Sequence, residues 1–169
     1  MAFSTTVAVT IAQQRRSGAF DQSINHPAVK YLTADTDTVV DRLNQKLRDG
    51  SAKLVYDPKT GYLKSVLDLL HVPVESQVMV YTQTSLQAQH IRMDNPRAIY
   101  FNDTVAVSWS KGADTMEAAV LDATQGVHFY TIAQERQPKP KFDRRSDCLE
   151  CHLMPQTSNV PGVFAMSVL

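Results

Sequence analysis

The sequence predicts an α+β fold, built mainly as an antiparallel β meander with two or three short helices. Three observations support this prediction. Apolar residues recur at helical spacing in two segments between Ala34 and Val72. From Glu75 onward they alternate with polar residues instead, as in a half-buried strand. The connections between these later segments are short and carry Gly, Asn or Asp, which favours antiparallel hairpins over parallel crossovers.

The length and composition indicate one globular domain. The chain has 169 residues, which is enough for one sizeable core and short for two domains. Hydrophobic residues make up 43% and charged residues 20%, as in ordinary globular proteins. Seventeen basic residues balance seventeen acidic ones, so no global charge favours nucleic acid as a partner. No apolar run approaches the roughly 20 residues that span a bilayer, so no transmembrane segment is expected.

Residues 1–25 are expected to form an N-terminal arm. Residues 6–12 (TVAVTIA) are β-branched and alternating, which predicts a short strand or an extended segment. Arg15 and Arg16 follow this apolar stretch, whereas the positive charges of a secretory signal precede its apolar region. As numbered, the chain therefore shows no export signal.

Two helices are predicted in the first half of the chain. The first lies within 34–50, with Asp35 or Thr36 as its N-cap and Gly50 as its stop. The second lies within 62–72, where four apolar residues share one helical face before a proline ends the segment.

The remaining regular elements are predicted strands. A short strand is expected at 53–61, ending in a Pro-Lys-Thr-Gly turn. Alternation places Val105, Val107 and Trp109 on one face of their strand, which is expected to be the core face. Residues 97–134 should form the meander. The strands predicted after Glu75 are 76–84, 97–101, 104–109, 115–122 and 127–134.

The chain's only two cysteines follow a predicted loop. Residues 135–147 carry two prolines, five basic and three acidic residues and almost nothing to bury. Next, in SDCLECHLMP, Cys148, Cys151 and His152 stand in the order Cys-x-x-Cys-His. Attachment of haem c needs two thiols about one helical turn apart, and an imidazole on the next residue to reach the iron. The sequence therefore predicts one covalent haem c with His152 as the proximal iron ligand.

This prediction defines residues 1–169 as a single haem-binding domain, with 135–169 as its haem-attachment segment. Three other interpretations of the cysteine pair stay open. A structural zinc site takes four ligands, so a distant residue such as His26, His71, His90 or His128 would have to supply the fourth. A thioredoxin-like dithiol normally lies in a βαβ setting, whereas this pair follows a Pro-rich basic loop. The triplet can also arise by chance.

The stretch CLECH resembles the attachment motif of c-type cytochromes. A β-rich body with this motif near the C-terminus is also similar to the cytochrome P460 and cytochrome c′-β group. The segments HPAVKY, VPVESQV, NPRAIYFNDTVAV and VHFYTI resemble a cytochrome c-like domain found in longer bacterial proteins of uncharacterised function. Small helical cytochromes c carry the motif near the N-terminus instead, and the alternating strands here argue against the four-helix cytochromes c′.

The ligand on the other side of the iron decides the chemistry. Met166, in VPGVFAM, and His26, in NHPAV, are the candidates for this distal position. A methionine in an apolar run is also explained as core packing, and a histidine in a polar stretch as a solvated side chain. An occupied position would make an electron carrier, and an open one would make a gas-binding or peroxidatic site.

The resemblance implies a monohaem c-type cytochrome that transfers electrons, as a subunit or partner of a larger redox complex. The alternatives are a P460 or c′-β-like haem enzyme or gas-binding protein, and a structural zinc-binding module. Covalent haem attachment in c-type cytochromes occurs outside the bacterial cytoplasmic membrane, which implies a periplasmic or extracytoplasmic protein. Its partner would be a redox protein or a membrane-bound electron-transfer complex, and the basic loop 135–147 either steers an acidic partner or is simply solvated.

Overall fold

The structure is a computed structural model that describes residues 30–163. The predicted arm 1–25, with its strand at 6–12, lies outside the described residues, and so do both candidate distal ligands, His26 and Met166. The described elements are α3 (Val39–Asp49), α4 (Leu63–Leu69), η1 (Val74–Ser76), β1 (Val78–Val80), η2 (Ala88–His90), β2 (Arg97–Phe101), β3 (Val105–Trp109), β4 (Thr115–Asp122), β5 (Gly126–Ala133), β6 (Asp143–Arg145), α5 (Leu149–His152) and η3 (Pro155–Thr157).

Within residues 30–163 the strands form one six-stranded antiparallel sheet, in the order β1-β2-β3-β4-β5-β6. Neighbours in the sheet are also neighbours in the sequence, so the predicted α+β fold with a mainly antiparallel meander is confirmed. The β4–β5 hairpin has the longest strands of this sheet, with eight residues in each. The predicted strand at 76–84 is shorter than expected, because only Val78–Val80 pairs with β2.

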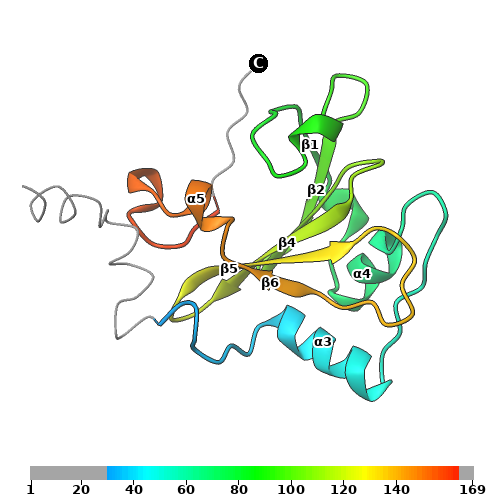
Figure 1. The fold of residues 1–169 in the computed structure, drawn as a ribbon, viewed down its shortest axis with the longest axis horizontal. Helices are drawn as coiled ribbons and strands as arrows, with labels where there is room; N and C mark the ends of the chain where they lie inside the picture. The colour runs from blue at the N-terminus through cyan, green and yellow to red at the C-terminus, as the bar shows by residue number, and fades with distance from the viewer. Residues whose placement is uncertain (1–29, 164–169) are drawn as a thin grey trace, which may run out of the picture.

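The two faces of the sheet carry different apolar clusters. The first face packs against α3 and α4 in the main core, which includes Val107, Val120 and Ile132. The predicted core residues Val105 and Val107 are buried there, and Trp109 packs at the margin of this core. In Figure 1, α3 and α4 lie on one side of the sheet and α5 on the other. The second face carries a smaller cluster, made of Tyr31, Val127, Phe129, Leu149 and Leu153.

Helix α3 begins at a different residue from the one predicted. Its N-cap is Thr38, not Asp35 or Thr36, because the Thr38 hydroxyl accepts the N–H of Asp41 at 3.2 Å and the Asp41 carboxylate accepts the N–H of Thr38 at 3.0 Å. The helix ends as predicted at Gly50, which has a φ of +80°. The sequence offered several polar residues as caps, and the reciprocal pair of bonds selects Thr38.

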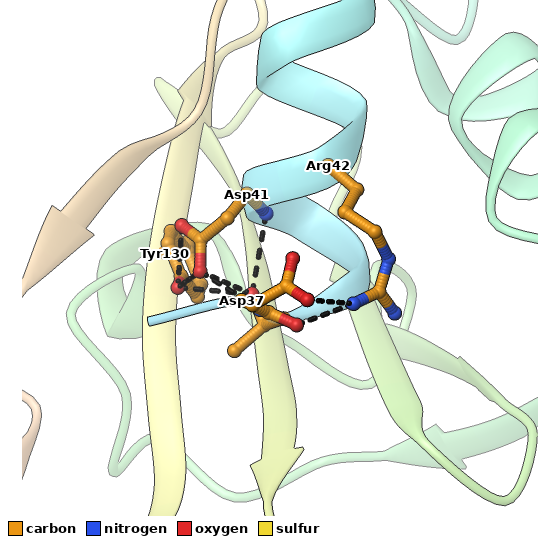
Figure 2. Close-up of polar contacts among 5 residues, drawn as sticks. Asp37, Asp41, Arg42 and Tyr130 are labelled. Carbon is orange, nitrogen blue, oxygen red and sulfur yellow. Dashed lines mark hydrogen bonds and ion pairs between the residues drawn. The ribbon is translucent and has the colours of Figure 1, made fainter. Parts of the chain in front are cut away.

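Asp41 also fastens α3 to the sheet. The Tyr130 hydroxyl, from β5, donates to the Asp41 carboxylate at 2.9 Å, as Figure 2 shows. Burial acts to raise the pKa of Asp41, but hydrogen bonds from Thr36, Thr38 and Tyr130 outweigh it and the pKa is lowered. The neighbouring pair of Asp37 and Arg42 is exposed and contributes little to stability.

The strand predicted at 53–61 is not formed. An isolated bridge between Asp57 and Gly61 closes the predicted turn, but residues 53–56 pair with no other strand. The Ser65 hydroxyl, from α4, accepts the N–H of Val55 at 3.0 Å. This side chain of the following helix satisfies the backbone that a neighbouring strand would otherwise pair.

The segment predicted as a loop at 135–147 contains a strand. Residues Asp143–Arg145 form β6, which pairs with Phe129–Thr131 of β5. The preceding Phe142 is buried in the main core, and its N–H and carbonyl both bond to the side-chain amide of Asn44. Phe142 therefore anchors the segment against α3, and the prediction was wrong because it gave this single aromatic too little weight.

Candidate functional site

Cys148, Cys151 and His152 lie on a single helical turn. Cys148 is the N-cap of α5 with a helical backbone, and its carbonyl accepts the N–H of His152 at 3.0 Å. Residues three and four apart in a helix share one face, so this turn brings the two thiols and the imidazole to one side. No disulfide joins the two cysteines. The spacing predicted from the motif is therefore realised in the backbone.

The turn is anchored to the second face of the sheet. Leu149 and Leu153 are 0% and 7% exposed and pack with Phe129 and Tyr31. Two leucines four residues apart point the same way and insert together into the cluster. Cys148 is half-buried against this cluster and Cys151 is exposed. Apolar burial thus holds the motif on the second face of the sheet, in a cluster that joins Tyr31 and the leucines of the α5 turn to β5.

The His152 ring is held by two contacts. Its centroid lies 4.7 Å from that of Phe129, with the ring planes tilted by 41°. Its Nδ1 lies 3.0 Å from the carbonyl oxygen of Gly162. A carbonyl oxygen only accepts hydrogen bonds, so Nδ1 carries the proton in this bond and Nε2 keeps its lone pair. Burial lowers the pKa of His152, which favours the neutral ring that binds metals.

Gly162 is held in place by the hairpin below it. The Pro161 carbonyl accepts the N–H of Val127 at 2.9 Å, and the N–H of Gly162 donates to the His152 carbonyl at 3.0 Å. Gly126, which has a φ of +87°, lies directly under Pro161: a Cβ at this position would be 2.4 Å from the Pro161 oxygen. The absence of a side chain at Gly126 therefore allows the approach that positions Gly162.

Replacing Gly126 by Ala is expected to lower the free energy of unfolding by about 1–3 kcal/mol more than replacing Gly112 by Ala. Both glycines have a positive φ, which costs an alanine about 1–2 kcal/mol, but the added Cβ at Gly112 meets nothing within 4 Å. Urea unfolding measures the difference. Nitrogen NMR of His152 should also show a smaller fraction of the Nδ1–H tautomer in Gly126→Ala alone. Equal losses in the two variants would contradict this account.

The surroundings of Cys148 disfavour the thiolate. Burial, together with the charges of Asp147 and Glu117, raises its pKa to about 12. Redox dithiols and zinc sites both use cysteine as thiolate. A thioether is neutral, so its burial carries no charge penalty. The site therefore suits the thioether of an attached haem better than a reactive dithiol or a zinc ligand.

The other predicted candidates lie apart from this turn. His71 is exposed at the end of α4, and His90 is half-buried in η2. His128 is fully buried and faces the same side as Tyr130, with its ring stacked on Tyr31 at 4.5 Å. Among residues 30–163, no three His, Cys, Asp or Glu side chains are arranged to hold a metal ion. Zinc binding by the motif would need its side chains to rearrange or a ligand from outside this range.

Sequence reasoning missed three residues near the motif: Gly162, Arg97 and Glu117. Arg97 and Glu117 form an ion pair at 3.6 Å, and their charges act on the pKa values of His152 and Cys148 respectively. For Arg97 and Glu117, the only signal in the sequence was a charged residue within each of two apolar strands. That Arg97 meets Glu117 depends on strand register, and that Gly162 meets His152 depends on how the chain folds back. Neither contact follows from a local pattern.

Within the part of the chain that the structure describes, no helix has the length and apolar character to span a membrane. No protein-family model, curated protein or solved structure matches this chain, so its function is argued from the residues of the site.

Proposed function

We propose that this protein is a monohaem c-type cytochrome that transfers electrons. Cys148 and Cys151 attach one haem c covalently, and His152 binds its iron on the proximal side. The observation that carries the proposal is the 3.0 Å bond between His152 Nδ1 and the Gly162 carbonyl. Metal-binding histidines typically donate their second ring nitrogen in this way, which orients the ring and leaves Nε2 for the metal.

The residues around the motif have defined tasks in this proposal. When bound, haem supplies an iron that exchanges one electron between its ferric and ferrous states. Leu149 and Leu153 anchor the attachment turn in the apolar cluster. Phe129 packs against the His152 ring and limits its rotation. Gly162 fixes the tautomer of His152 and increases the basicity of Nε2, which tunes the reduction potential.

A haem protein with an open iron position, of the P460 or c′-β kind, is the second candidate. Apart from Arg97, Ser108 and Glu117, the second face of the sheet carries an apolar part made of Ile99, Phe101, Ala106 and Ala119, as the strand register shows. None of these side chains has an atom that binds iron. An iron facing them would therefore remain open to a small ligand such as carbon monoxide.

The cellular setting and the partner belong to the same proposal. Covalent haem attachment implies a periplasmic or extracytoplasmic protein, by resemblance to c-type cytochromes. A monohaem carrier needs an electron donor and an acceptor, so a redox protein or a membrane-bound electron-transfer complex is its expected partner.

The full chain produced together with a bacterial haem c maturation system tests the proposal. The intact mass of denatured protein is expected to increase by one haem, and the reduced protein should show the sharp visible bands of a c-type haem. Protein that carries no haem under these conditions would sink the proposal. Rapid carbon monoxide binding by the reduced protein would favour the open iron position, and slow or absent binding would favour an occupied one.

A further inference from the structure

Arg97 of β2 and Glu117 of β4 form the most buried ion pair among residues 30–163. Their side chains are 16% and 21% exposed, whereas every other described ion pair has both partners at 38% or more. Strand β3 lies between β2 and β4, and its Ser108 is directly opposite Glu117. The Arg97 side chain therefore reaches across β3 over the second face of the sheet.

The ion pair with Glu117 does not provide acceptors for all the N–H donors of the Arg97 guanidinium. Arg97 Nη1 and Glu117 Oε2 are 3.6 Å apart, beyond ordinary hydrogen-bond length, and the buried Nε of Arg97 has no partner among the described residues. Burial raises the pKa of Glu117 and lowers that of Arg97, because their mutual attraction does not offset the loss of water. A guanidinium has five N–H donors, so Arg97 can bind a second anion beside Glu117.

This pair lies next to the attachment turn. Glu117 and Ala119 are two residues apart in β4 and share the second face, and Ala119 packs with Cys148 against the cluster that holds α5. The second face beside Arg97 is open and apolar: Val78 and Phe101 are 45% and 44% exposed, and Phe101 stands in one cross-strand row with Ala106 and Ala119. The guanidinium therefore borders an exposed apolar surface next to the turn that carries Cys148, Cys151 and His152.

We propose that Arg97 binds a propionate carboxylate of the haem held by Cys148 and Cys151; this rests on the proposed function. Haem combines an apolar ring with two carboxylates, which matches an apolar sheet surface bordered by a cation with free donors. Charge-assisted bonds from a guanidinium to a carboxylate are strong and directional. Arg97 is then a positioning residue that keeps one propionate ionised and holds the haem edge on the sheet.

The haem-loaded full chain tests this with the double variant Arg97→Met/Glu117→Gln. Removing both charges leaves the net charge unchanged and leaves no unpaired charge buried. A propionate that has lost its cation should have a raised pKa and titrate between about pH 5 and 8. At a fixed applied potential, the ratio of ferrous to ferric protein should then rise as the pH falls, by up to about tenfold per pH unit.

The wild type and the Arg92→Met variant are the controls, since Arg92 forms an exposed ion pair with Asp94. Both should show a much flatter pH dependence. Identical curves in the double variant and the wild type would overturn the role of Arg97. Wild-type protein that carries no haem would overturn the proposed function itself, which distinguishes the two failures.

If the double variant fails to fold, the wild type alone still tests whether Arg97 binds a propionate. In wild-type protein carrying haem labelled with ¹³C in its propionate carboxyls, one carboxyl signal should stay ionised below about pH 4 while the other titrates normally. Two normally titrating signals would overturn the proposal.

Discussion

Replacing Cys148 and Cys151 together by Ser is expected to abolish covalent haem, because a hydroxyl does not form the thioether that each thiol forms. Each single variant should keep one covalent bond and thus retain haem after denaturation, in lower yield. The two sulfurs make no disulfide, so the folded chain should lose little stability. Intact mass after maturation, compared with the visible spectrum, measures the loss.

Ser146→Ala is the matched control for the cysteine variants. Ser146 is exposed and lies two residues before Cys148, at the entrance to the same turn. It should load haem like the wild type, and urea unfolding of the haem-free proteins should give similar midpoints for all of them. Covalent haem in the double variant would show that attachment uses other residues.

The buried histidine of β5 is expected to make stability depend strongly on pH. His128 is 0% exposed, its ring stacks on Tyr31, and neither ring nitrogen has a partner among the described residues. Burial and, to a smaller extent, the charge of Arg144 lower its pKa to about 4, against the opposing charges of Asp122 and Asp41. The folded protein therefore keeps this ring neutral well below the pH at which a free histidine takes up a proton.

The sign of the effect follows from proton binding. Between about pH 6.5 and 4 the unfolded chain binds a proton at His128 and the folded chain does not, so the free energy of unfolding falls as the pH falls. The whole shift corresponds to roughly 3 kcal/mol, which is a large part of the stability of a small domain. Above about pH 6.5 this residue should contribute no pH dependence.

Urea unfolding of the haem-free protein from pH 7 to 4 measures this loss, with His128→Phe as the test variant. A phenyl ring preserves an aromatic contact with Tyr31 but binds no proton, so its stability should fall by roughly 3 kcal/mol less over this range. His71→Asn serves as the control, because His71 is exposed and its positive φ of 53° suits Asn. Parallel pH curves for wild type and His128→Phe would refute the linkage.

Much of the fold was predictable because its determinants are local. Alternation from Val105 to Trp109 identified β3 and its core face, since side chains of a strand point alternately to its two faces. Gly50 marked the end of α3, since a left-handed φ favours glycine. The errors arose where several candidates compete or distant contacts decide: the reciprocal bonds with Asp41 select Thr38 as N-cap, and the packing of Phe142 creates β6.

The candidate site also has a part that the sequence predicts and a part that depends on tertiary contacts. The order of Cys148, Cys151 and His152 predicted that they share one helical turn, because helical spacing depends only on adjacent residues. The buried surroundings of Cys148, which disfavour a thiolate, are not contained in any local pattern. The sequence offered His128 as a possible fourth zinc ligand, and the structure places it in the fully buried interior beside Tyr31.

The sequence by itself determined the antiparallel meander and the single turn that presents two thiols and an imidazole. Both depend on periods of a few residues, which the chain order contains. Only the tertiary structure decided that Gly162 accepts from His152, that Gly126 leaves room for this contact, and that Arg97 meets Glu117 beside the motif. Those contacts join residues from separate strands and turns, and they form only once strand register and chain closure bring them together.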